Sequence, residues 1–269
     1  MGFFTKAVSA AFLTLAPSLA WACGPDSDCA LGDRIYRIQM PAGVDKPGAI
    51  VFAHGYQGTA TGTMRNSGLR AMADRLGVAL VAVKSLGRDW AIPGVPMDMA
   101  ADGTQELAYF DALIPALADR HGIDTDRLML SGFSAGGMVT WQIACDRGDL
   151  FAGYAPIAGT FWRPAQPETC PGGAVHMFHT HGLSDRIVPL EGRPIAETHQ
   201  GSVPKSLEML RTMGGYAGAE RFTEAGLDCE RATNPDGKLL EYCTHGGGHA
   251  MQAAYVERAW RRLEAAGAL

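Results

Sequence analysis

The sequence predicts an α/β fold in which a doubly wound, mostly parallel sheet is flanked by helices. Short apolar runs, typical of strands buried on both faces, alternate with longer stretches of helical periodicity. Hydrophobic residues make up 47% of the 269 residues, which is enough to build a substantial core. Because strands alternate with helices, βαβ units and parallel pairing are favoured.

The expected elements follow one another along the chain. Strands are expected over residues 34–40, 49–53, 78–83, 126–131, 153–159, 174–181 and 238–243. Helices are expected over residues 64–76, 104–120, 134–145, 205–213 and 250–266, with a kink at Pro115. Residues 84–102 carry several turn signals and are expected to form a long surface loop. The sequence contains no repeat or linker, so we expect residues 23–269 to form a single catalytic domain.

The first 22 residues have the features of a signal peptide. Lys6 supplies a positive charge, residues 7–19 are apolar but short for a membrane span, and Ala20-Trp21-Ala22 fits a cleavage site. We therefore expect cleavage before Cys23 and a secreted or periplasmic protein with no membrane span. Lipid anchoring at Cys23 is the less favoured alternative, because lipoprotein signals usually carry an aliphatic residue where Ala20 stands.

The mature chain would keep all six cysteines, an even number that favours disulfides in an exported protein. Six cysteines allow about 15 connectivities. We expect neighbours to pair, as Cys23–Cys29, Cys145–Cys170 and Cys229–Cys243. No C-x-x-C spacing occurs, which argues against a metal or redox role.

The charge pattern indicates no nucleic-acid partner. The net charge is −5, charged residues make up 19% of the chain, and no run of lysine or arginine occurs. The sequence carries no signal for an oligomeric state.

The stretch Gly132-Phe133-Ser134-Ala135-Gly136 follows a buried strand and opens a helix. This G-x-S-x-G pattern is typical of a nucleophile elbow, a strained turn that pushes the serine hydroxyl out of the sheet. The two glycines allow close approach of neighbouring chain segments. The backbone N–H of Ala135 would then face an oxygen anion formed beside Ser134. A glycine-rich turn without function is the alternative.

Two further candidates follow later strands. Asp185 comes after the strand at 174–181, and His249 comes after the strand at 238–243 and a run of three glycines. The order Ser134, Asp185, His249 is that of a hydrolase triad on this type of sheet. His249 would be the general base and Asp185 would orient it. His245 is an alternative base, and Asp185 could instead be a turn residue or a helix cap.

The loop after the strand at 49–53 is expected to complete the oxyanion hole. Backbone N–H groups of Tyr56 or Gln57 are the candidates, and His54 is expected to hydrogen-bond within this loop. Trp90 and Trp162 follow predicted strands and could form an apolar wall for the substrate, although packing in the core is an equal alternative.

Histidines 176, 179 and 181 suggest a metal site, because His179 and His181 share one face of a strand. No carboxylate or cysteine spacing completes such a site, so we expect no metal.

Several of these segments together resemble the secreted polyhydroxybutyrate depolymerase, feruloyl esterase and acetylxylan esterase group of α/β-hydrolases. The matching segments are an early cysteine pair followed by residues 34–38, then residues 54–58, 132–138, 181–189 and 246–249. The resemblance implies hydrolysis of carboxylic esters through an acyl-serine intermediate, with no cofactor. Polymer-degrading relatives usually add a linker and a binding domain, so a small ester or oligoester substrate is expected. A serine peptidase of the same fold and a non-catalytic binding protein are the alternatives.

Overall fold

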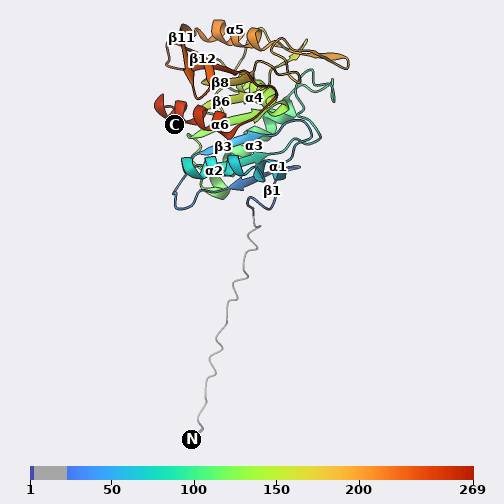
Figure 1. Ribbon diagram of the computed structural model, residues 1–269. Coiled ribbons are helices and arrows are strands. Elements are labelled where there is room, and N and C mark those ends of the chain that lie inside the picture. The colour runs from blue at the N-terminus through green and yellow to red at the C-terminus, as the bar shows by residue number, and fades with distance from the viewer. Residues whose placement is uncertain (3–22) are drawn as a thin grey trace.

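The computed structural model describes residues 1–2 and 23–269, and the expected signal peptide therefore lies outside the described residues except for its first two. Within residues 23–269, ten strands form one sheet in the order β1-β2-β4-β3-β5-β6-β8-β13-β12-β11 (Figure 1). Their bounds are β1 Cys29–Leu31, β2 Arg34–Gln39, β3 Ala49–Ala53, β4 Ala79–Val83, β5 Leu128–Phe133, β6 Gly153–Ile157, β8 Met177–Gly182, β11 Ala217–Glu224, β12 Leu227–Thr233 and β13 Leu239–His245.

The centre of the sheet is parallel. Strands β4, β3, β5, β6, β8 and β13 pair in parallel with their neighbours, whereas β1, β2, β12 and β11 extend the two edges in antiparallel fashion. Parallel pairing brings the carboxyl ends of the central strands to one edge, where ligands bind in sheets of this kind.

In the described part of the chain, six helices cover the two faces of the sheet (Figure 1). They are α1 Ala60–Met64, α2 Ser67–Leu76, α3 Thr104–His121, α4 Ala135–Asp146, α5 Val203–Gly214 and α6 Ala253–Ala265. Helices α3, α4 and α5 pack on one face and α1, α2 and α6 on the other. Alternation along β3 explains the division, because Val51 faces the first group of helices and Phe52 the second.

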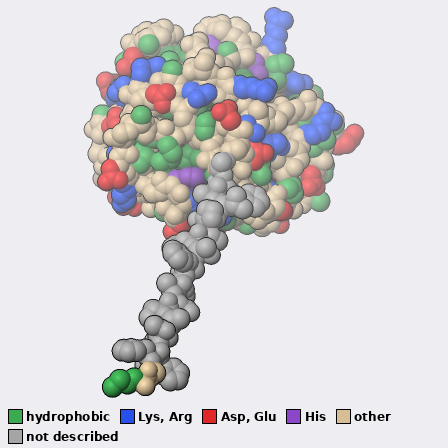
Figure 2. All heavy atoms as spheres, turned by 90° about the horizontal axis from the view of Figure 1, so that it is seen from below, with side chains coloured by type: hydrophobic (Ala, Val, Ile, Leu, Met, Phe, Trp, Pro, Cys, Tyr) green, Lys and Arg blue, Asp and Glu red, His purple; other side chains and the backbone are tan. Residues whose placement is uncertain are grey.

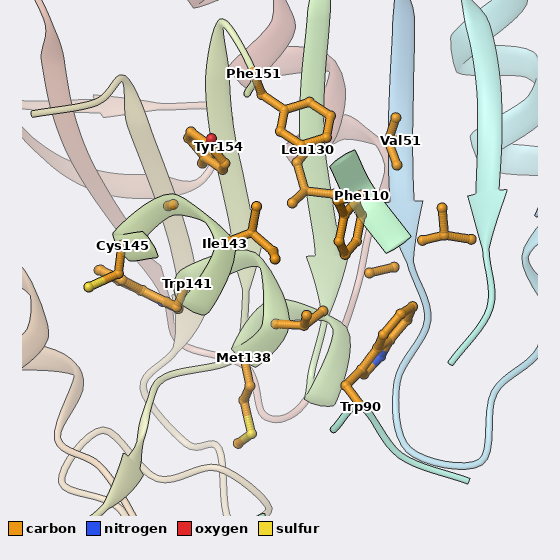
Figure 3. Packing of buried hydrophobic residues seen from close by; sticks show 14 of the residues in the cluster. Val51, Trp90, Phe110, Leu130, Met138, Trp141, Ile143, Cys145, Phe151 and Tyr154 are labelled. Carbon is orange, nitrogen blue, oxygen red and sulfur yellow. The ribbon is translucent and has the colours of Figure 1, made fainter. Parts of the chain in front are cut away.

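The core beside α4 holds several aromatic side chains. Figure 3 shows Trp141 on α4, Leu130 on β5 and Phe110 on α3 in one packed cluster. Trp90 lies beyond the end of the strand that carries Val51, and all these side chains are almost fully buried.

The strands expected from apolar runs are confirmed to within a few residues. The expected helix over 64–76 is instead two helices, because the Asn66 side chain accepts a hydrogen bond from Leu69 N at 3.1 Å and starts a second helix. Helix α3 runs unbroken through Pro115.

Several strands were not expected from the sequence. Strands β11 and β12 form a hairpin at the sheet edge, and β11 is largely exposed, so it lacks the apolar pattern that marks a strand. A separate small sheet in the order β7-β10-β9 is built from β7 Trp162–Arg163, β10 Thr198–Gln200 and β9 Pro194–Ile195. These pieces are too short to show a period of two. The three-residue strand β1 was also missed.

The expected disulfide pairing is confirmed. Cys23 pairs with Cys29, Cys145 with Cys170 and Cys229 with Cys243. The last two cysteines lie directly opposite each other in β12 and β13.

The surface mixes charges of both signs. Among the described residues on the face drawn in Figure 2, basic and acidic side chains are interspersed. In the described part of the chain, every helix is too short or too polar to cross a bilayer.

Candidate active site

Ser134 lies at a sharp turn between β5 and α4. Its φ of 58° and ψ of −121° are strained for a residue with a side chain. The turn is fixed on both sides, since Ser134 N donates to the Ile157 carbonyl at 2.9 Å and Met138 N donates to the Ser134 carbonyl at 2.9 Å. Ala135 is the first residue of α4, so its N–H has no acceptor within the helix.

The flanking glycines are required by close contacts. A Cβ on Gly132 would lie 2.9 Å from Thr140 Oγ1 and would overlap the backbone of Gly136. A Cβ on Gly136 would lie 2.7 Å from the His54 carbonyl oxygen. These distances are shorter than real Cβ contacts, so the strand, the helix and the loop after β3 can meet only at glycines.

Asp185 and His249 are brought together from the ends of two neighbouring strands. Asp185 follows β8, His249 follows β13, and these strands pair in parallel. Asp185 Oδ2 accepts a hydrogen bond from His249 Nδ1 at 2.7 Å. The two loops are also tied through their backbones, since Leu183 N donates to the His245 carbonyl at 2.8 Å and Ser184 N to the Gly247 carbonyl at 3.0 Å.

Asp185 is a buried carboxylate with many donors. Its Oδ1 accepts from Ile187 N at 2.8 Å and from Val188 N at 2.9 Å. Burial alone would raise the pKa of Asp185, but hydrogen bonds from His181, His249 and these two backbone groups outweigh it and hold the pKa below its usual value. The side chain therefore stays ionised and can stabilise a charged imidazole.

His249 rather than His245 faces this carboxylate. The His249 ring packs on Phe133, the residue before Ser134, with ring centroids 4.6 Å apart. The His245 ring stacks on Tyr255, and its Nδ1 accepts from Gly247 N at 3.1 Å. The hydrogen bonds among residues 23–269 do not include one from Ser134 to His249. In unliganded sites this bond is commonly long and tightens when substrate binds.

His54 fixes the loop after β3 through hydrogen bonds of its ring. The His54 Nδ1–H donates to the Gly55 carbonyl at 2.7 Å, and Nε2 accepts from Ser85 N at 3.2 Å. Burial lowers the pKa of His54 to about 4, so the ring is neutral and this pattern is stable at physiological pH. The expectation that His54 hydrogen-bonds within the loop is confirmed.

Only one of the two expected loop donors is free. The Gln57 N–H donates to the Arg88 carbonyl at 2.7 Å, so it is not available to an oxygen anion, and the expectation for Gln57 is wrong. The Tyr56 N–H has no acceptor among the described residues. Tyr56 and Ala135 line the same pocket as Ser134, so their backbone N–H groups remain the candidate oxyanion donors.

A pocket of about 430 Å³ opens beside Ser134 and Ala135. Tyr56 also lines it, and most other lining side chains are apolar. They include Pro96, Met97, Met138, Trp162, Ile187, Val188 and Ile195. The small sheet supplies Trp162, Ile195 and Gln200, so its three strands form one wall. Such a pocket suits an apolar or aromatic group of a small ligand.

The two tryptophans have different positions. Trp162 lines the pocket, as expected for a substrate wall, although its own side chain is 4% exposed. Trp90 does not line the pocket that contains Ser134. It is 1% exposed, and its Nε1–H donates to the His54 carbonyl at 2.8 Å. We therefore correct the expectation for Trp90, which supports the loop after β3 from the core.

A carboxyl group that sequence reasoning missed also lines this pocket. Asp89 Oδ1 accepts from Trp90 N at 2.9 Å. Burial raises the pKa of Asp89 to about 6, and nearby Glu106 adds to the rise despite the hydrogen bond from Trp90 N. Its place in the long loop at 84–102 gave no sequence signal.

Two groups of residues among those described lie close enough to hold a metal ion. They are Cys23, Cys29 and His121, and Cys229, Glu241 and Cys243. In each group both cysteines form a disulfide and offer no thiolate. Each group thus keeps one ordinary ligand.

The chain is similar to known esterases. It is 30% identical over 244 residues to the putative esterase NocK of Nocardia uniformis subsp. tsuyamanensis, covering 80% of this chain and 70% of that protein. It is 26% identical to feruloyl esterase D of Neurospora crassa over 58% of this chain and 51% of the relative. The Prolyl oligopeptidase family, Peptidase_S9, matches residues 98–163.

Solved structures share the fold. The acetyl xylan esterase from Aspergillus awamori superposes with a TM-score of 0.62 at 15% identity, covering 90% of this chain and 99% of that structure. The fold, the elbow and these relatives define a carboxylic ester hydrolase. The chain belongs to the esterases of the α/β-hydrolase fold.

Proposed function

We propose that this protein is a secreted serine esterase that acts through an acyl-enzyme on Ser134. The observation that carries the proposal is the 2.7 Å hydrogen bond between Asp185 and His249, beside a serine in the strained elbow conformation. Asp185 fixes the proton of His249 on Nδ1, which leaves Nε2 free to accept the Ser134 proton.

The reaction would proceed in two halves. Ser134 Oγ attacks the ester carbonyl while His249 takes its proton, and the backbone N–H groups of Ala135 and Tyr56 stabilise the resulting oxyanion. His249 then protonates the departing alcohol, leaving the acyl group on Ser134. Water, deprotonated by His249, hydrolyses this ester and restores the free serine.

The substrate would be a small ester or an oligoester. The apolar pocket beside Ser134 supports an aromatic or medium-sized apolar acyl group, as in feruloyl esters, or a hydroxyalkanoate oligomer as in the polyhydroxybutyrate depolymerases. Acetyl esters would fill it only in part.

We further propose that residues 23–269 form one catalytic domain behind a cleaved signal peptide. One sheet that includes strands from β1 to β13 supports a single domain. Three disulfides support export to an oxidising compartment. The pairing of Cys23 with Cys29 uses the thiol that a lipid anchor would need, and so favours an unanchored protein.

A peptidase of the same fold is the second candidate, supported by the match of residues 98–163 to the Prolyl oligopeptidase family. The acyl transfer is the same for both bonds, so the triad does not distinguish them. A non-catalytic binding protein would not require the strained conformation of Ser134.

A substrate panel tests the proposal. We expect hydrolysis of p-nitrophenyl esters, methyl ferulate and hydroxybutyrate oligomers, labelling by a fluorophosphonate, and loss of both in Ser134→Ala. Cleavage of peptide anilides without ester hydrolysis would favour the peptidase. Ester hydrolysis that persists in Ser134→Ala would place the nucleophile elsewhere.

A further inference from the structure

A chain of buried rings leads from α4 to the carboxylate beside His249. Trp141 Nε1 lies 3.2 Å from His179 Nδ1, and His179 Nε2 lies 3.0 Å from His181 Nδ1. His181 Nε2 lies 2.7 Å from the Val188 carbonyl oxygen and 3.5 Å from Asp185 Oδ2. Trp141, His179 and His181 are all fully buried.

The direction of every bond in this chain follows from its first member. An indole N–H only donates, so His179 Nδ1 must accept and cannot carry a proton. Neutral His179 then carries its proton on Nε2 and donates it to His181 Nδ1. His181 must in turn carry its proton on Nε2, where the acceptors are the Val188 carbonyl and the Asp185 carboxylate. All three donors point toward the loop that holds Asp185.

Burial favours the neutral form of the His179 ring, in agreement with this geometry. Burial lowers the pKa of His179 well below its usual value, and the neighbouring His181 adds to the effect. Among the described residues, the titratable groups that face the pair include Asp185, whose Oδ2 is 3.5 Å from His181 Nε2, Tyr242, whose ring centroid is 5.8 Å from that of His179, and His245 beside His181.

We propose that His181 is a positioning residue for the esterase reaction, held in one tautomer by His179 and Trp141. This inference rests on the proposed roles of Asp185 and His249. His181 holds the Val188 carbonyl on one side of the Asp185 loop, while Asp185 Oδ1 holds Ile187 N and Val188 N on the other. The carboxylate is thereby fixed with Oδ2 toward His249.

The arrangement also links both ends of the site. Trp141 lies on α4, the helix that begins directly after Ser134, and Val188 lines the pocket beside Ser134. The ring chain thus connects the helix behind the nucleophile to the loop of the acid. A purely structural role for two buried histidines would need only some hydrogen-bond acceptor. Here the Nε2–H of His181 points specifically at the Asp185 loop.

The tautomers can be measured without any assay of activity. Nitrogen-15 NMR of the histidine rings should show His179 and His181 as neutral Nε2–H tautomers at neutral pH, with His249 as Nδ1–H. A Trp141→Phe variant removes only the first donor and should release His179 to the other tautomer in part of the molecules. His181 found as Nδ1–H or as imidazolium in the wild-type protein would overturn the proposal.

Kinetics test the positioning role. His181→Phe keeps an aromatic ring, slightly larger than imidazole, and removes both nitrogens. We expect kcat to fall by up to about 100-fold, the loss that a misplacement of about 1 Å in the reacting groups can cause, with KM little changed. His181→Gln can accept from His179 and donate to Val188, so it should recover much of kcat. His176→Phe is the control, because it removes a buried imidazole just before the same strand. Among the described residues, the hydrogen-bond partner of this imidazole is Leu239 N, at 3.1 Å.

The pH profile separates positioning from simple loss of stability. With one donor fewer on Asp185, the carboxylate stabilises a charged His249 ring more strongly. The acidic limb of kcat/KM should therefore move to higher pH in His181→Phe but not in His176→Phe. Unchanged kcat and an unmoved limb in folded His181→Phe would refute the role. If the wild-type protein hydrolyses no ester and takes no fluorophosphonate label, the proposed function fails, while the NMR result still decides the ring geometry.

Discussion

Gly136 lies directly against Ala53, so that a Cβ on Gly136 would come within 2.5 Å of the Ala53 carbonyl carbon. This contact joins the first turn of the helix after Ser134 to the end of β3, where the loop that carries the proposed oxyanion donor Tyr56 begins. The spacing between the backbone N–H groups of Tyr56 and Ala135 therefore depends on residue 136 having no Cβ.

Gly136→Ala should prevent the native fold or lower the free energy of unfolding by more than about 4 kcal/mol. The atoms that the new Cβ would meet belong to the backbone of Ala53 and His54 and cannot move aside. Thermal unfolding followed by circular dichroism measures this. Gly246→Ala is the matched control, because a Cβ there meets nothing within 4 Å. A native-like melting temperature for Gly136→Ala would show that β3 and α4 can separate.

Two substitutions at Ser134 should separate chemistry from strain. Ser134→Ala and Ser134→Gly both remove the proposed nucleophile and should abolish ester hydrolysis. Ser134→Gly should also be more stable than Ser134→Ala by about 1–3 kcal/mol, because glycine adopts a positive φ without strain. Chemical denaturation of both variants gives the difference. Equal stabilities would mean that the elbow stores no strain in solution.

Asp89→Asn should change how stability depends on pH. The pKa of Asp89 is about 6 in the folded protein against 3.8 for an ordinary aspartate, so the folded state binds more protons between these values. The contribution of Asp89 to the free energy of unfolding is therefore fully present below the pKa of the unfolded state, and it is lost as the pH rises through the pKa of the folded state. The amide introduced by Asp89→Asn would keep an acceptor for Trp90 N without ionising.

The melting temperature of Asp89→Asn should therefore exceed that of the wild-type protein above about pH 6, and the gap should shrink toward about pH 4. Asp98→Asn, at an exposed residue of the same loop, is the control. A gap that does not vary with pH would show that Asp89 titrates alike in the folded and unfolded chains.

Trp90 and Trp162 form a matched pair that measures what one buried indole N–H group contributes to stability. Trp90→Phe breaks the bond to the His54 carbonyl and should cost about 1–3 kcal/mol beyond the lost packing. Trp162 Nε1 is buried with no partner among the described residues, so Trp162→Phe should cost only the packing. Denaturant unfolding and kcat test this, since Trp90→Phe should also lower kcat by loosening the Tyr56 loop. A larger stability loss in Trp162→Phe would contradict it.

Much of this molecule could be predicted from the sequence, because apolar runs such as residues 49–53 report burial on both faces. The elbow at Ser134 and its partners could be found because their order along the chain is constrained by the sheet. The choice between Tyr56 and Gln57 could not, since it depends on whether Arg88, far along the chain, offers its carbonyl.

The burial of a side chain by elements distant in the sequence could not be predicted either. Trp90 follows a strand, as a substrate wall would, yet it points into the core. The hairpin of β11 and β12 gave no apolar pattern because its outer strand faces solvent. The sequence indicated that His179 and His181 share one face of a strand. It did not show that Trp141, on helix α4, donates to His179 and so sets the direction of the hydrogen bonds.

The pairing of β8 with β13 has a consequence for how the chain folds. Asp185 and His249 are 64 residues apart, and α5 and the β11–β12 hairpin lie between them. Parallel strands of high sequence separation pair slowly, because the intervening chain must be ordered before their contacts form. Collapse and helix formation can thus precede the step that brings His249 to Asp185. If Ser134 is the nucleophile as proposed, the rate at which fluorophosphonate labelling returns during refolding would report a late step of assembly, in which β13 docks beside β8 and brings His249 to Asp185.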